Sequence, residues 1–152
     1  VIALNLNKHI PDNLIDYYAS ANESRIPLDQ HKYENLKKPI IIPKVKLKKI
    51  KKNIKDVDYF DYGVLVKNNK FEFHKNFAII PYNLTFAYAV AVALVGKAKS
   101  IAFAGLDGYK KNHRLTNEMQ ETIKVILKNN RSLKLKSLTD TNYSLINWKL
   151  NG

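Results

Sequence analysis

The sequence predicts an α/β fold, a three-layer Rossmann-like domain with a mostly parallel sheet and helices on both faces. Strand-like and helix-like segments alternate from Tyr82 to Thr139, which is the pattern of a βαβ unit. The 152 residues, 45% of them hydrophobic, are enough for a single domain (1–152) with a sizeable core. The chain opens directly on a strand without an initiator Met, so we expect it to be a C-terminal fragment of a longer protein.

The first half of the chain predicts three strands. Residues 1–7, VIALNLN, indicate a buried strand that ends at the turn HIPDN, and residues 14–22 indicate an aromatic-rich second strand. Prolines bracket the third strand, Ile40–Ile42, and a short helix is expected between the second and third strands, at residues 26–36. Residues 45–54 are lysine-rich with one apolar side, which fits either a short helix or a basic loop.

The second half predicts a hairpin, two helices and two strands. The turn Asn68-Asn69-Lys70 separates two apolar runs, which favours a hairpin. An Ala-rich helix follows Tyr82; it is apolar nearly all round, so we expect it to be buried, with Gly96 as its stop. SIAFAGL (100–106) predicts a strand, and the next segment predicts a helix capped by Thr116. LKLKSLT (133–139) alternates apolar and polar residues, as an edge strand does.

Composition limits the possible partners. The net charge of +13 favours anionic ligands, although a lysine-covered surface without any specific partner is the simpler explanation of the same charge. Nucleic acid is disfavoured, because Arg is scarce and no RNA-binding motif is present. The chain has no Cys and no apolar stretch long enough to cross a bilayer, and we expect a cytoplasmic location. The four His residues show no metal-ligand spacing, so we expect no metal in this domain.

The segment AGLDGY is the leading candidate for a ligand site, because it follows a predicted buried strand. In parallel α/β sheets, ligands bind beyond the carboxyl ends of the strands. Gly105 would let the backbone approach a ligand closely, Asp107 could accept hydrogen bonds from sugar hydroxyls, and Tyr109 could stack or donate to a phosphate. The alternative is that these residues only shape a tight strand-to-helix turn.

A polar rim follows the first two predicted strands. Asn5 and Asn7 follow the first strand, and Arg25 closes a second polar group that also contains Ser20, Asn22 and Ser24. Arg25 could form two parallel hydrogen bonds with a phosphate or carboxylate. Each of these residues alone also fits an ordinary polar loop. His113 could reach the mouth of the site as a base, or lie in a surface loop; no catalytic residue is assigned.

Two long stretches, NLTFAYAVAVALVGKAKSIAFAGLDGYKKNHRLTNEMQETIKVIL and LKLKSLTDTNYSL, resemble a known domain. It is the C-terminal domain of TIM-barrel aldolases of the 4-hydroxy-2-oxovalerate aldolase type, encoded in bacterial surface-polysaccharide and lipopolysaccharide gene clusters. VIALNLNKHIP, LIDYYAS and KKPIIIP keep that family's order, so the resemblance covers nearly the whole chain. The core is more distantly similar to the Rossmann-like fold of a bacterial sialyltransferase family.

The resemblance implies an accessory domain of an aldolase or lyase in carbohydrate metabolism. The domain would bind a nucleotide, nucleotide sugar or acidic sugar and would hold no cofactor, with chemistry and a divalent metal in an upstream aldolase barrel. The alternatives are a glycosyltransferase-like enzyme with His113 as base and a purely structural or oligomerising domain. The chain lacks the Gly-Pro-Ser loop and strand of these relatives, leaves few residues after Tyr109 for a catalytic lid, and has Asp140 where the family has Pro.

Overall fold

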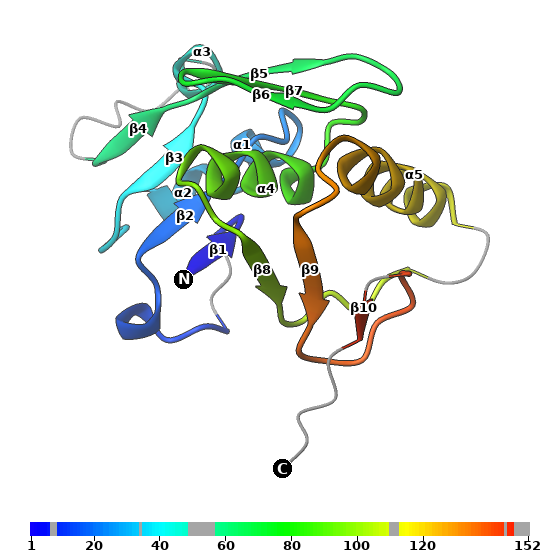
Figure 1. Ribbon diagram of the computed structural model, residues 1–152. Helices are drawn as coiled ribbons and strands as arrows, with labels where there is room; N and C mark the ends of the chain where they lie inside the picture. The colour runs from blue at the N-terminus through cyan, green and yellow to red at the C-terminus, as the bar shows by residue number, and fades with distance from the viewer. Residues whose placement is uncertain (7–8, 34, 49–56, 110–112, 145, 148–152) are drawn as a thin grey trace.

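The computed structural model describes residues 1–6, 9–33, 35–48, 57–109, 113–144 and 146–147 (Figure 1). The fold is α/β with mostly parallel strands and is consistent with a Rossmann-like domain, as the sequence predicts. Within the described residues the strands pair into three small sheets, which we call A, B and C. Sheets A and C are entirely parallel, sheet B is mixed, and all three contribute to one core around the helix α4 (Thr85–Val95).

Sheet A contains four parallel strands in chain order: β1 (Ile2–Leu4), β2 (Tyr17–Ala19), β3 (Ile40–Ile42) and β4 (Tyr59–Asp61). Successive side chains of a strand point to opposite faces. Tyr18 and Ile40 accordingly belong to one buried cluster, and Ala19 and Ile41 to another. Both faces of sheet A are therefore covered at its central strands β2 and β3, as the predicted three layers require, whereas the edge strand β4 is exposed.

Short helical turns cover one face of sheet A. The expected helix at 26–36 is divided into α1 (Arg25–Leu28) and α2 (Gln30–Tyr33), which place Ile26 and Tyr33 in the core on this face. A 3-10 turn, η1 (Asp12–Leu14), connects β1 to β2. The lysine-rich stretch begins with the helical turn α3 (Lys44–Leu47), and its residues 49–56 lie outside the described residues.

The helix α4 (Thr85–Val95) lies at the centre of the molecule (Figure 1). It contacts β1 and β2, and also β6 (Glu72–Phe73), β7 (Phe77–Ile80) and α5 (Arg114–Asn129). Its sequence, TFAYAVAVALV, is apolar nearly all round, and this allows the helix to pack against several elements at once. The helix ends at Gly96 as predicted, and Lys97 takes the left-handed conformation with a φ of 63°.

Sheet B corrects the predicted hairpin. Its order is β5 (Gly63–Val66), β7 (Phe77–Ile80) and β6 (Glu72–Phe73), so β7 lies between the two strands that the Asn68-Asn69-Lys70 turn connects. The turn forms, with Asn69 at a φ of 58°, but β5 and β6 both pair with β7. The central position suits β7 because Ala78 and Ile80 are fully buried in the core around α4.

Sheet C confirms the predicted βαβ unit. The strands β8 (Ser100–Phe103) and β9 (Lys134–Ser137) are parallel neighbours, and α5 (Arg114–Asn129) lies between them in the chain. The edge position predicted for LKLKSLT is wrong, because β9 pairs on its other side with β10 (Ile146–Asn147). Alternating burial shows that one face of a strand is exposed, but it does not reveal whether both edges are paired. None of the helices in the described ranges combines the length and apolar character that a bilayer crossing requires.

Candidate ligand-binding pocket

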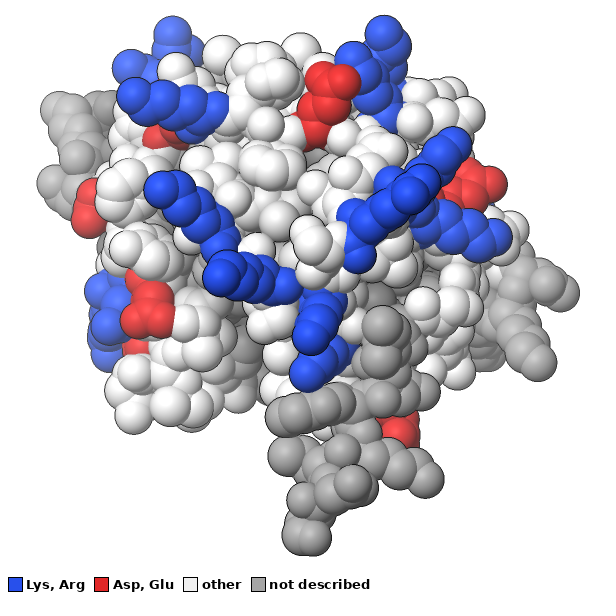
Figure 2. All heavy atoms as spheres, in the orientation of Figure 1, with Lys and Arg blue, Asp and Glu red and all other residues white. Residues whose placement is uncertain are grey.

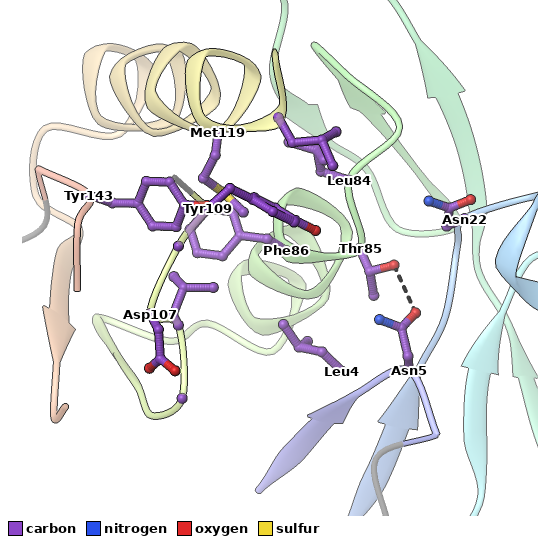
Figure 3. A pocket seen from close by; sticks show the side chains of 14 residues that line it. Leu4, Asn5, Asn22, Leu84, Thr85, Phe86, Asp107, Tyr109, Met119 and Tyr143 are labelled. Carbon is purple, nitrogen blue, oxygen red and sulfur yellow. Dashed lines mark hydrogen bonds between the residues drawn. The ribbon is translucent and has the colours of Figure 1, made fainter. Parts of the chain in front are cut away.

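A pocket of about 380 Å³ lies beyond the carboxyl ends of β1 and β8 (Figure 3). Its lining comes from the end of β1, the loop after β2, the first turn of α4, the loop after β8, α5, and the segment after β9. The residues that line it are Leu4, Asn5, Asn22, Leu84, Thr85, Phe86, Gly105, Leu106, Asp107, Gly108, Tyr109, Leu115, Met119 and Tyr143. The pocket thus lies where a parallel α/β sheet places its ligands.

Asn5 presents an amide group to this pocket. Its backbone has a φ of 56°, in the left-handed region that Asn tolerates better than most residues. Its backbone N–H donates to the Ala19 carbonyl (2.8 Å), and its Oδ1 accepts from the Thr85 hydroxyl (3.2 Å). Because the oxygen is engaged by Thr85, the NH2 group is left on the pocket side, as Figure 3 shows.

Asn22 presents a second amide in the same way. Its Oδ1 accepts from the Ser24 backbone N–H (3.1 Å), the Ser24 hydroxyl (2.7 Å) and the Arg25 N–H (3.4 Å). These bonds order the start of α1 and fix which end of the amide is oxygen. The amide nitrogen of Asn22 faces the pocket (Figure 3). The sequence places Asn22 in the polar rim without assigning it to the site.

The amino end of α4 lies between these two amides and the loop after β8. The helix begins after Leu84, which has no side chain that can cap it. The first N–H groups of a helix have no partner within the helix, and the helix dipole makes this end positive. The first turn of α4 therefore adds backbone donors and a positive potential to the pocket.

The loop Gly105–Tyr109 is held by the segment that follows β9. Three hydrogen bonds join them: from the Gly105 N–H to Thr139 Oγ1 (2.9 Å), from Thr141 Oγ1 to the Leu106 carbonyl (2.6 Å), and from the Asn142 N–H to the Asp107 carbonyl (3.0 Å). We call residues 139–143 the clasp. Sequence reasoning missed it, although a Ser- and Thr-rich run directly after a strand is a recognisable signal for such bonds.

Tyr143 completes the clasp beneath Gly108. A Cβ atom added at Gly108 would lie 3.2 Å from Tyr143 Cζ, so the ring packs directly on the glycine backbone. Tyr143 is buried, and burial raises the pKa of its hydroxyl. A hydrogen bond between that hydroxyl and the Tyr109 backbone acts in the opposite direction and is the weaker effect. Gly108 is therefore required by packing as well as by its φ of 95°.

Asp107 and Tyr109 lie at the open side of the pocket. The Asp107 carboxylate is directed away from the Tyr109 ring (Figure 3), and Asp107 and Tyr109 are both exposed. The Tyr109 ring stacks on the His113 ring, with centroids 4.9 Å apart and an interplanar angle of 15°. Its hydroxyl points across the pocket toward Thr85 (Figure 3). Tyr109 can therefore contact a bound ligand with its ring and its hydroxyl.

His113 caps α5, which begins at Arg114, so the cap predicted at Thr116 is wrong. His113 Nδ1 accepts a hydrogen bond from the Leu115 N–H (3.2 Å). In a neutral imidazole whose Nδ1 accepts, the proton lies on Nε2, which then acts as a donor. His113 could serve as a base only after giving up this cap.

The predicted site residues thus have three different outcomes. Asn5, Gly105, Asp107 and Tyr109 line the one pocket. Arg25 does not line it: its Nε donates to the buried Asp29 carboxylate (2.9 Å). Asn7 lies outside the described residues, so its ligand contact stays a prediction.

The described residues contain no cluster of three or more His, Asp or Glu side chains that could hold a metal ion. Comparison of the chain with protein-family models, curated proteins and solved structures found no match.

Proposed function

We propose that this domain binds a nucleotide, nucleotide sugar or acidic sugar in the pocket beyond β1 and β8. The observation that carries the proposal is the pair of Asn5 and Asn22 amides, whose oxygens are both engaged within the protein. Their NH2 groups point to the same space as the uncapped end of α4. Such an arrangement favours a ligand rich in acceptor atoms, above all a phosphate or carboxylate.

The rest of the pocket fits the remainder of such a ligand. The Tyr109 ring can lie against a base or a sugar ring, and the exposed Asp107 carboxylate can accept hydrogen bonds from hydroxyl groups that extend out of the open side of the pocket. A volume of about 380 Å³ is within the range of small-molecule pockets. Bound ligand would therefore place its anionic part at α4 and its sugar or base at the loop after β8.

Binding without catalysis is the version we favour. His113 is the residue that the glycosyltransferase alternative needs as a base, and its Nδ1 is engaged in capping α5. We propose that the domain serves a larger aldolase- or lyase-type enzyme of surface-carbohydrate biosynthesis, in the cytoplasm, with a metal-dependent barrel upstream. This wider setting rests on the sequence resemblance.

Calorimetric titration of the chain with CMP, UDP and N-acetylneuraminic acid tests the proposal. Asn22→Asp keeps an oxygen for Ser24 and Arg25 but replaces the NH2 donor with a negative charge. We expect affinity for the ligand that binds to fall by about ten- to a hundredfold, the cost of one hydrogen bond to a charged group. Asn13→Asp makes the same chemical change on the exposed turn η1 and should leave affinity unchanged.

Two results would contradict the proposal. One is the absence of binding by every compound of the panel, and the other is an equal affinity for the Asn22→Asp and Asn13→Asp variants. Release of free CMP from a CMP-sugar by this chain would favour the glycosyltransferase alternative instead.

A further inference from the structure

Four cationic side chains gather at the edge of sheet C opposite the pocket, where β8 and β9 begin. Lys97 and Lys99 lie in the connection from α4 to β8, and Arg131 and Lys134 lie where α5 leads into β9. The Lys134 N–H donates to the Lys99 carbonyl (3.3 Å), so the two connections are direct neighbours. All four residues are exposed. We call them the amino-edge cluster.

The chain on either side of this cluster contains no acidic residue. The segments 92–106 and 125–139, which contain the four residues, contain no Asp or Glu. Within the described part of the chain none of the four forms an ion pair, whereas Arg25, Lys70 and Arg114 each have a carboxylate partner. Figure 2, drawn in the orientation of Figure 1, shows Lys and Arg side chains across the middle of the molecule and the Asp and Glu side chains nearer its outline.

The ends of two helices explain only part of the positive charge. Both α4 and α5 end just before this edge, and Lys and Arg are favourable near the carboxyl end of a helix. Each such end is equivalent to about −0.5 elementary charge, so the two ends together offset about one cation. About three positive charges of the cluster remain uncompensated, which leaves them available to an external anion.

We propose that the amino-edge cluster binds the surface of an anionic membrane through its lipid headgroups. Three of its four charges are Lys, a point charge that suits diffuse attraction better than forked recognition of one phosphate. None of the four lines the ligand pocket or a smaller pocket beside Tyr18. Val95, an exposed apolar side chain, lies next to them in the chain, as suits contact with headgroups.

A membrane is favoured over single-stranded nucleic acid on the same surface. Proteins that bind single strands stack the bases on exposed aromatic rings. The only aromatic residue in segments 92–106 and 125–139 is Phe103, which packs inward against Phe86 with ring centroids 4.8 Å apart. Membrane binding at the amino edge would also leave the pocket at the opposite edge open to its ligand.

Each Lys or Arg near an anionic surface strengthens binding about fivefold. The three uncompensated charges together should therefore strengthen binding to an anionic membrane on the order of a hundredfold. Because the attraction is electrostatic, salt should weaken it strongly.

Sedimentation with phosphatidylcholine vesicles, with and without phosphatidylserine, tests the proposal. We expect the wild-type chain to bind only the phosphatidylserine vesicles, at least tenfold more weakly at high salt. A quadruple variant removes the cluster: Lys97→Gln, Lys99→Gln, Arg131→Gln and Lys134→Gln. A matched control removes four exposed lysines on α3 and sheet B with the same change in net charge: Lys44→Gln, Lys48→Gln, Lys67→Gln and Lys75→Gln.

The cluster variant should lose binding by at least tenfold more than the control variant. An equal loss in both variants would overturn the proposal, because net charge alone would then explain binding. The proposal would also be overturned if binding of the wild-type chain did not depend on phosphatidylserine or on salt, and this test needs no variant. Stronger binding of the wild-type chain to duplex DNA or to RNA than to phosphatidylserine vesicles would assign the surface to nucleic acid instead.

Discussion

Gly108→Ala should destabilise the protein far more than Gly105→Ala, although both glycines have a positive φ in the same loop. Gly105 has a φ of 70°, and an added Cβ would meet no atom within 4 Å. Gly108 has a φ of 95°, and its Cβ would lie 3.2 Å from both Asn142 Cβ and Tyr143 Cζ. Tyr143 is only 4% exposed, so its ring has little room to move away.

These differences set the expected magnitudes. At Gly105 the left-handed backbone costs about 1 to 2 kcal/mol for a residue with a Cβ, partly offset by about 0.4 to 1 kcal/mol from the stiffer unfolded chain. At Gly108 the backbone strain of about 1 to 3 kcal/mol is joined by overpacking of about 1 to 3 kcal/mol. Taking the middle of each range and applying the same unfolded-state offset at both glycines, we expect a loss of about 1 kcal/mol for Gly105→Ala and about 3 kcal/mol for Gly108→Ala.

Urea unfolding followed by circular dichroism measures both losses as shifts of the midpoint at constant slope. Gly108→Ala should also weaken ligand binding in the pocket, because the clasp can no longer hold the loop in place. A Gly105→Ala variant as unstable as Gly108→Ala, or more so, would refute the packing of Tyr143 on Gly108.

Two further predictions concern a helix cap and a buried carboxylate. His113→Ala should lower the free energy of unfolding by about 1 kcal/mol, because the cap of α5 is lost. His113→Asn should lower it much less, because the Asn side chain can also accept a hydrogen bond from the first turn of α5. Equal thermal stability of the two variants would contradict the role of His113 as the cap. Burial raises the pKa of Asp29, but hydrogen bonds from Lys32 and Arg25 outweigh it, so the pKa is lowered overall. The ionised carboxylate therefore stabilises the fold above about pH 4 and loses this effect as the pH falls through the lowered pKa. The stability difference between wild type and Asp29→Asn, measured by urea unfolding, should shrink in acid; a difference independent of pH would contradict this.

The fold could be predicted wherever one local pattern decided the outcome. Ile40–Ile42 is bracketed by prolines and forms β3 with those bounds, and the all-round apolar α4 is buried at the centre. The pairing in sheet B could not be predicted, because the Asn68-Asn69-Lys70 turn specifies a reversal of the chain but not which strand lies beside which. Long-range packing of Ala78 and Ile80 against α4 decided that β7 is central.

The candidate site was predictable to a similar extent. The rule that ligands bind beyond the carboxyl ends of parallel strands placed Asn5 and Asp107 in the same region, and both line the pocket. Asn22 and the clasp were not assigned, because their part in the site depends on hydrogen bonds between segments far apart in sequence. Arg25 was placed in the rim by its position after β2, but its nearest strong partner is Asp29, one helical turn away.

The central claim is that the NH2 groups of Asn5 and Asn22 bind the acceptor atoms of a ligand. It is tested most directly by the side-chain NH2 signals of these two residues in a ¹H–¹⁵N NMR titration with CMP, UDP or N-acetylneuraminic acid. Each signal is assigned by its loss in the corresponding Asp variant. We predict that both signals shift, saturate together, and give the same affinity as calorimetry. Saturable binding that leaves both NH2 signals unmoved would contradict the claim.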